Sequence, residues 1–179
     1  MKKLFVLFAV LLAALFVVGC ASKPAAPAAP AGPSAAELMA SAKGGAPMGV
    51  LVGQATASSQ TTAQNNAVIQ VKRGLKAIVV ELVDAQVTAG AVASSVSTQL
   101  KQAMSAAIDG TTIGGIVKVD SGADVTGRGW AIYSLTKDEA LKVITSAANE
   151  AKENVAAGNF APSSGFDNVF AKAAGMEWK

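Results

Sequence analysis

Apolar residues recur at helical and strand spacings through most of the chain, and this pattern predicts the elements of its fold. The longest stripe repeats every three or four positions, as expected of a helix that packs on a sheet, and comprises Ala67, Val71, Leu75, Ile78 and Leu82. Thr61 and Gln64 have capping-box spacing and predict the start of this helix. Residues 88–90 predict its end. Gly74 lies within the stripe and indicates close packing against a neighbouring element.

Three segments are rich in strand-forming residues. Residues 49–57 predict a first strand, whose two glycines indicate close backbone contact. Residues 111–120 and 125–135 predict the two strands of a β-hairpin with its turn at residues 121–124. Alternation along the last strand places Trp130 and Ile132 on the same face of the sheet.

Three further helices are predicted from the spacing of apolar residues and from residues typical of helix ends. Residues 92–107 carry an apolar residue about every fourth position, and Thr136 with Glu139 forms a second capping box that opens a helix through residue 155. Residues 166–174 form a short helix ended by Gly175. The order strand, helix, helix, hairpin, helix, helix predicts an α+β domain. In it, two or more helices pack on one face of a small antiparallel sheet.

The N-terminal residues have the pattern of a lipoprotein export signal. Lys2 and Lys3 precede an apolar run over residues 4–18, and Gly19-Cys20 follows it. The alternative is an uncleaved transmembrane anchor, but this run is 15 residues long, against the ~20 that span a bilayer. We therefore expect residues 1–19 to be a signal peptide and Cys20 to be the lipidation site, with attached acyl chains that anchor the mature protein in a membrane.

A tether is expected to follow the lipidated cysteine. Residues 20–47 contain five of the six prolines, spaced by alanine and glycine, which favours an extended polyproline conformation. A short helix over residues 35–43 is expected within the tether, ended by Gly44-Gly45. The single folded domain is expected over residues 48–179. Ala21 stands where aspartate would retain a Gram-negative lipoprotein in the inner membrane, which implies the outer membrane.

Composition limits the chemistry. The chain has no histidine, and its one cysteine is the expected lipid site, which excludes histidine triads, disulfides, thiolate nucleophiles and histidine or thiolate metal sites from the mature protein. Loss of residues 1–19 removes two lysines and leaves 13 basic and 12 acidic side chains, so the basic balance gives no argument for nucleic-acid binding. We expect no cofactor, no small-molecule substrate and no enzymatic activity.

The remaining charged residues have ordinary structural interpretations. Asp120 and Asp124 flank a glycine and could suggest calcium, but the other oxygen ligands of a calcium loop are missing, and a hairpin turn is the favoured interpretation. Asp138 and Glu139 could suggest a two-carboxylate mechanism, yet neighbours on a helix point apart and acidic residues are common in a first turn. Lys72, Arg73 and Lys76 are expected on a solvated helix face.

Glycine pairs and one tryptophan complete the candidates. Gly114-Gly115 and residues 127–129 lack the strand–turn–helix setting of a phosphate loop, and β-bulges are the favoured interpretation. Trp130 is expected in the core rather than as a ligand platform.

From the lipid signal to Leu141 the chain resembles the twenty-kilodalton outer-membrane lipoprotein family, which includes FlgP-like flagellar disk lipoproteins. The resemblance is carried by the signal and four segments: residues 43–47, the strand residues 52–55, the helix start 62–67, and the aromatic strand and helix start 129–140. The chain differs from the family in having Met48-Gly49 after Pro47. The resemblance implies a lipidated cysteine, a small α+β module, no catalytic residues, and assembly into envelope rings or disks.

These observations predict a non-catalytic outer-membrane lipoprotein with a structural or assembly role in the cell envelope. Its domain is expected in the periplasm, its partner is a second copy or another envelope protein, and a ring or disk at the flagellar motor is the specific form that the resemblance implies. The alternative is a tethered periplasmic adaptor or activator of an envelope enzyme or transporter. A carboxylate enzyme is the third hypothesis.

Overall fold

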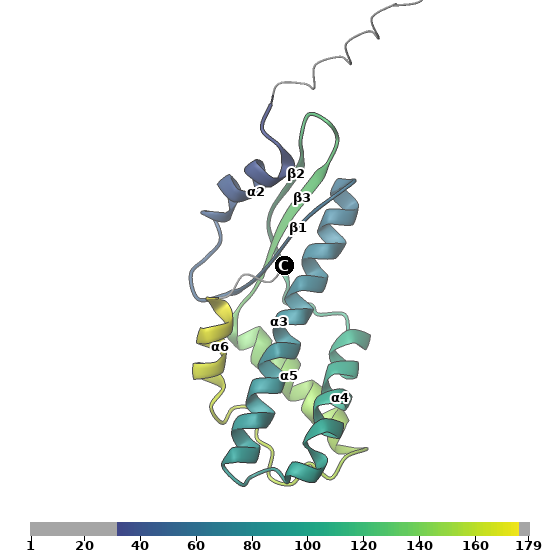
Figure 1. The fold of residues 1–179 in the computed structure, drawn as a ribbon, viewed down its shortest axis with the longest axis vertical. Helices are drawn as coiled ribbons and strands as arrows, with labels where there is room; N and C mark the ends of the chain where they lie inside the picture. Colours follow the sequence, from purple (N-terminus) through teal and green to yellow (C-terminus); the bar gives the residue numbers. More distant parts are fainter. Residues whose placement is uncertain (1–31, 176–179) are drawn as a thin grey trace, which may run out of the picture. The chain divides into compact units, whose positions relative to one another are not determined.

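The computed structural model describes residues 32–175, which form an α+β fold with a small antiparallel sheet (Figure 1). Its elements follow in the order α2 (Ala35–Lys43), β1 (Leu51–Ala57), α3 (Gln60–Thr88), α4 (Ser94–Gly110), β2 (Val117–Ala123), β3 (Gly129–Leu135), α5 (Lys137–Lys152) and α6 (Phe166–Ala174). The predicted fold class and the strand-plus-hairpin sheet are therefore confirmed. Within residues 32–175, no helix is long and apolar enough to cross a membrane.

The sheet has the strand order β1-β3-β2, and both pairings are antiparallel. Leu51 pairs with Leu135 at one end of the β1–β3 ladder, and Ala57 pairs with Gly129 at the other. The β2–β3 ladder shifts register between Lys118 and Asp120, so the bulge lies in β2. Six of the seven residues of the central strand β3 are buried, as expected for a strand covered on both faces.

The sheet carries a helix on each face, whereas the sequence predicted helices on one face only. On one face Ala131 packs with Ala63 and Ala67 of α3. On the other, Trp130 and Ile132 pack with Ala35 of α2. Because successive strand residues point to opposite faces, a strand that is apolar at both sets of positions needs two covers.

Helix α2 is part of the packed unit, although the sequence placed its residues within the tether. The helix has the predicted bounds, with Ser34 as its N-cap and Gly44 as its C-cap. Its residues Ala35, Leu38, Met39 and Ala42 lie against the second face of the sheet. The spaced prolines on either side made this short amphipathic helix read as part of the tether. The packed unit begins at Gly32 and not at Met48, where the sequence predicted it.

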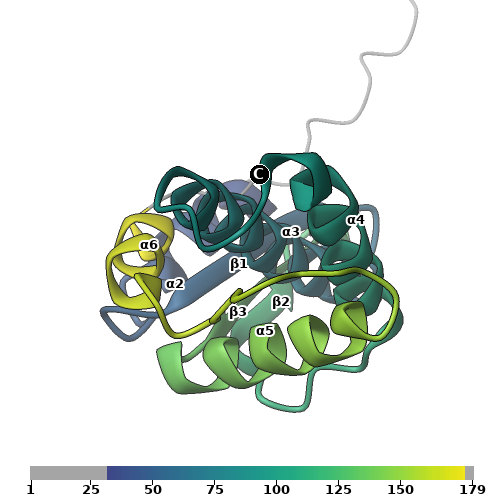
Figure 2. The ribbon, with the colours of Figure 1, turned by 90° about the horizontal axis from the view of Figure 1, so that it is seen from below.

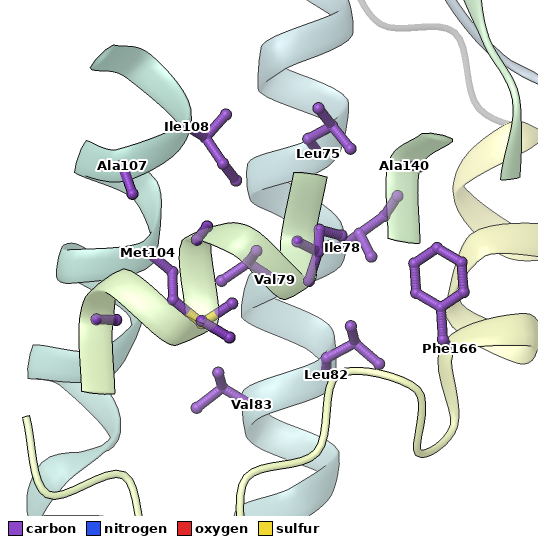
Figure 3. Packing of buried hydrophobic residues seen from close by; sticks show 14 of the residues in the cluster. Leu75, Ile78, Val79, Leu82, Val83, Met104, Ala107, Ile108, Ala140 and Phe166 are labelled. Atoms are coloured by element: carbon purple, nitrogen blue, oxygen red, sulfur yellow. The ribbon is translucent and has the colours of Figure 1, made fainter. Parts of the chain in front are cut away.

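The main core lies where the C-terminal half of α3 meets α4, α5 and α6 (Figures 2 and 3), beyond the end of the sheet (Figure 1). Helix α3 supplies the buried side chains Leu75, Ile78, Val79, Leu82 and Val83. Met104 and Ile108 of α4, Ala140 of α5 and Phe166 of α6 close around them (Figure 3). All five residues of the predicted α3 stripe are fully buried, so this prediction is confirmed.

Several predicted boundaries are wrong, and the first hairpin strand, predicted from residue 111, begins at Val117. Helix α3 begins at Gln60, and its cap is Ser59, whose hydroxyl accepts from the backbone N–H of Thr62 at 3.3 Å. The hairpin turn lies after Ala123, where residues 124–128 close the loop, because the carboxylate of Asp124 accepts three hydrogen bonds from Thr126 and Arg128. The cap of α5 is confirmed, since the Thr136 hydroxyl accepts from the Glu139 N–H.

Candidate functional site

Cys20, the predicted lipidation site, lies outside the described residues, as do the predicted signal peptide and the first part of the predicted tether, up to residue 31. The other residues that the sequence singled out are described. They fall into a hairpin carboxylate pair, a helix start and a basic cluster.

Asp124 organises the hairpin loop. Its Oδ1 accepts hydrogen bonds from the Thr126 N–H at 2.8 Å, the Thr126 hydroxyl at 2.6 Å and the Arg128 N–H at 3.0 Å, and its Oδ2 accepts from the Ala35 N–H at 3.0 Å. These donors, the Thr126 hydroxyl first, lower the pKa of Asp124 to about 2. Asp120 accepts from the adjacent Ser121 N–H. Among residues 32–175, no group of three or more acidic or thiol side chains could hold a metal ion, and the turn interpretation fits this geometry.

The start of α5 is built around an ion pair. Glu139 Oε1 lies 2.6 Å from Lys142 Nζ, and this contact raises the pKa of Lys142. Gly115 lies so close to Glu139 that an added Cβ would stand 2.6 Å from its Cγ. Gly114 and Gly115 form a turn that precedes β2, so the predicted bulge at this position is wrong.

The basic cluster on α3 holds the end of α4. Lys72 Nζ donates to the backbone carbonyls of Asp109 and Thr111 at 2.9 and 2.8 Å, and Lys76 forms an ion pair with the Asp109 carboxylate at 2.9 Å. Both lysines remain partly exposed, as predicted for a solvated face, but their charges also complement the C-terminal end of the α4 helix dipole, which the sequence did not predict. Trp130 is buried, as predicted.

The feature that the sequence did not reveal is a hollow along the edge of β1 with which no other strand of residues 32–175 pairs, and we call this hollow the edge groove. It has a volume of about 490 Å³ and is lined by Met39, Gln54, Ala55, Thr56, Asn66, Ile69, Gln70 and Arg73. Three consecutive strand residues line it, with helices from opposite faces of the sheet on either side. Because side chains alternate between faces, such a hollow lies along the backbone edge of the strand.

The two edges of the sheet differ in their protection. β2 carries Lys118, Asp120 and the register shift, all of which discourage another strand from pairing at that edge. β1 carries the sequence LVGQATA, which has no charged residue and no proline. Ile69, on the α3 wall of the groove, is 47% exposed. The β1 edge is therefore the one suited to receive another strand.

An open strand edge recognises extended polypeptide. Main-chain N–H and C=O groups of β1 can form hydrogen bonds with an added strand, and the flanking side chains select its residues. The sequence signal for this site is the absence of charge and proline from β1, but which strand lies at an edge depends on the pairing order. That order is set by contacts between residues far apart in the chain.

Comparison of the chain with family models, curated proteins and solved structures returned no match. The resemblance noted from the sequence therefore stays a prediction that rests on those residues alone.

Proposed function

We propose that this chain is a non-catalytic lipoprotein of the outer membrane, anchored through lipid on Cys20, whose domain assembles with further copies of itself in the cell envelope. A ring or disk component at the flagellar motor is the specific role that the family resemblance suggests. The observation that carries the assembly role is the open, uncharged edge of β1 within the edge groove.

The unequal edges support pairing between copies. A strand that joins β1 antiparallel to a second β1 brings no charged side chains of β1 together, whereas the Lys118 and Asp120 edge disfavours such contact. A contact that uses the same surface on both copies closes a dimer. Growth beyond a dimer therefore requires a second surface, in addition to the β1 edge.

The membrane anchor supports the same role. Lipidation confines copies to a surface, which raises their effective concentration and favours weak edge contacts. The low charge of the mature chain adds little repulsion between copies.

The test is a charge placed on each edge in turn. Gln54→Lys with Thr56→Lys puts two like charges into the β1 edge, and Val117→Lys, at a position 59% exposed on β2, is the matched control. Native mass of the detergent-extracted full chain is measured by light scattering. We expect the β1 variant to lose the oligomer and the β2 variant to keep it.

Equal masses for wild type and both variants would exclude the β1 edge as the assembly contact. A wild-type monomer that co-purifies with one foreign envelope protein would favour the tethered adaptor instead. Retention of that partner by the β1 variant would then separate the adaptor contact from this edge.

A further inference from the structure

The first half of α3 runs along β1, the strand of the edge groove (Figure 1). A Cβ added at Gly53 would stand 2.2 Å from the carbonyl oxygen of Ala67. One added at Gly74 would stand 2.8 Å from Leu51 Cδ1, so the helix runs antiparallel to the strand. Ala67 also packs with Ala131 of β3. Where α3 passes Gly53, its axis therefore lies over the space between β1 and β3.

This position sets the distance between the α3 helices of two paired copies. Directly paired residues of antiparallel strands point to the same face, so a second β1 at the edge groove places both α3 helices on one face of the joined sheet. Their axes are then about two strand spacings, or ~10 Å, apart. Packed helices have axes about 8–10 Å apart. The strand contact and a helix contact can therefore form together.

The opposite face of the sheet leaves more room. There α2 packs on Trp130 and Ile132 of β3, the strand next to β1, and it reaches the edge groove through Met39. Because α2 lies mainly over a strand away from the edge, the α2 helices of two paired copies are further apart than their α3 helices. Contact between helices is therefore expected on the α3 face.

The side of α3 that faces the edge groove carries one exposed apolar residue. Asn66, Ile69, Gln70 and Arg73 line the groove from this helix, and their spacing of three, four and seven residues places them on one side of it. Ile69 is 47% exposed. Contact with a second α3 would remove its side chain from water, which favours association. Ile69 is therefore the residue through which two α3 helices can meet.

Full pairing of two β1 strands determines their register. The strand has seven residues, Leu51–Ala57, and two antiparallel copies pair along their whole length only when the central residue, Gln54, lies opposite itself. The Cβ atoms of such a pair are about 5 Å apart. The two Thr56 residues are then separated by four positions along the strands, or ~13 Å.

We propose that the edge groove receives β1 of a second copy with Gln54 opposite itself, and that the two α3 helices pack against each other through Ile69. This inference rests on the proposed function and specifies its interface. The joined unit is a six-stranded antiparallel sheet with a twofold axis at Gln54, covered on one face by a pair of antiparallel α3 helices.

Cysteine cross-linking of the detergent-extracted full chain tests the register. Gln54→Cys should form a disulfide-linked dimer on mild oxidation, because the paired Cβ atoms are within reach of a disulfide. Thr56→Cys, on the same strand, should remain uncross-linked. Wild type, whose single cysteine is Cys20, and Val117→Cys on β2 are the controls and should also run as monomers without reducing agent.

Charge substitution on α3 tests the helix contact. Ile69→Asp should raise the concentration at which half of the oligomer dissociates by about tenfold or more. Val80→Asp is the matched control, since Val80 is 40% exposed on the same helix but does not line the edge groove, and it should assemble as wild type does. Circular dichroism checks that both variants are folded.

The outcomes separate this interface from the proposed function. Equal cross-linking of the Gln54 and Thr56 variants would overturn the register, and wild-type assembly of Ile69→Asp would overturn the helix contact. If both occur while the two β1 lysines still lower the native mass, the β1 edge keeps its assembly role and only this interface fails. A wild-type chain that is monomeric at every concentration would contradict the proposed function itself.

Discussion

Gly53 of β1 lies directly under α3, and Gly53→Ala tests how closely the two elements pack. A Cβ at this position would stand 2.2 Å from the carbonyl oxygen of Ala67, 2.7 Å from Val71 Cγ2 and 2.8 Å from the Val71 nitrogen. Because two of these atoms are backbone, strand and helix must move apart until the shortest contact exceeds about 3.0 Å. Overpacking of this kind costs about 1–3 kcal/mol, and rigid backbone partners place Gly53 near the upper value.

Loss of glycine also narrows the unfolded ensemble, which offsets the cost by about 0.4–1 kcal/mol. We therefore expect Gly53→Ala to lower the free energy of unfolding by about 2 kcal/mol in urea denaturation followed by circular dichroism, with an unchanged dependence on urea. Gly110→Ala is the matched control, because an added Cβ there meets nothing within 4 Å. It should change the free energy by less than about 1 kcal/mol. Equal effects of the two substitutions would refute the packing of β1 on α3.

Three further predictions follow from single contacts. Gln86→Leu removes a buried amide that forms hydrogen bonds with both the N–H and the carbonyl of Ala161, and it should lower the free energy of unfolding by about 1–3 kcal/mol. The control Gln99→Leu, at an exposed position, should lower it by less than about 0.5 kcal/mol. Equal losses for the two variants would contradict the role of the buried hydrogen bonds. Asp124→Asn should lower the melting temperature above pH 4. The difference in melting temperature from wild type should fade as the pH falls from 3.8 towards about 2, because the pKa of Asp124 is depressed in the folded state and its carboxylate stabilises the fold only while ionised. A difference in melting temperature that is independent of pH would contradict this role. Leu38→Ser should lower the free energy of unfolding by about 1 kcal/mol, because α2 packs on the sheet. The control Ala36→Ser, at an exposed position, should leave it nearly unchanged. An unchanged free energy for Leu38→Ser would contradict the packing of α2 on the sheet.

The elements with strong periodicity were predictable from the sequence. The α3 stripe, the strand β1 and the terminal helix α6 were predicted from the local spacing of apolar residues and from the residues at their ends, and all three are found. The cap of α5 follows from Thr136 and Glu139 for the same reason. These features depend on residues close together in the chain, where spacing alone determines which side chains share a face.

The misses depend on contacts between distant residues. Asp124 receives the Ala35 N–H from 89 positions away, and the burial of α2 on the sheet could not be inferred from a proline-rich stretch. Lys72 and Lys76 are drawn to the end of α4 by tertiary packing, although their spacing on α3 is that of a solvated face. The edge groove exists only because the hairpin places β3, and not β1, at the centre of the sheet.

The native mass of the detergent-extracted full chain tests the central claim most directly. The account predicts a homo-oligomer, and it predicts that Gln54→Lys with Thr56→Lys lowers its native mass while Val117→Lys leaves the mass unchanged. A wild-type protein that remains monomeric at every concentration would contradict it.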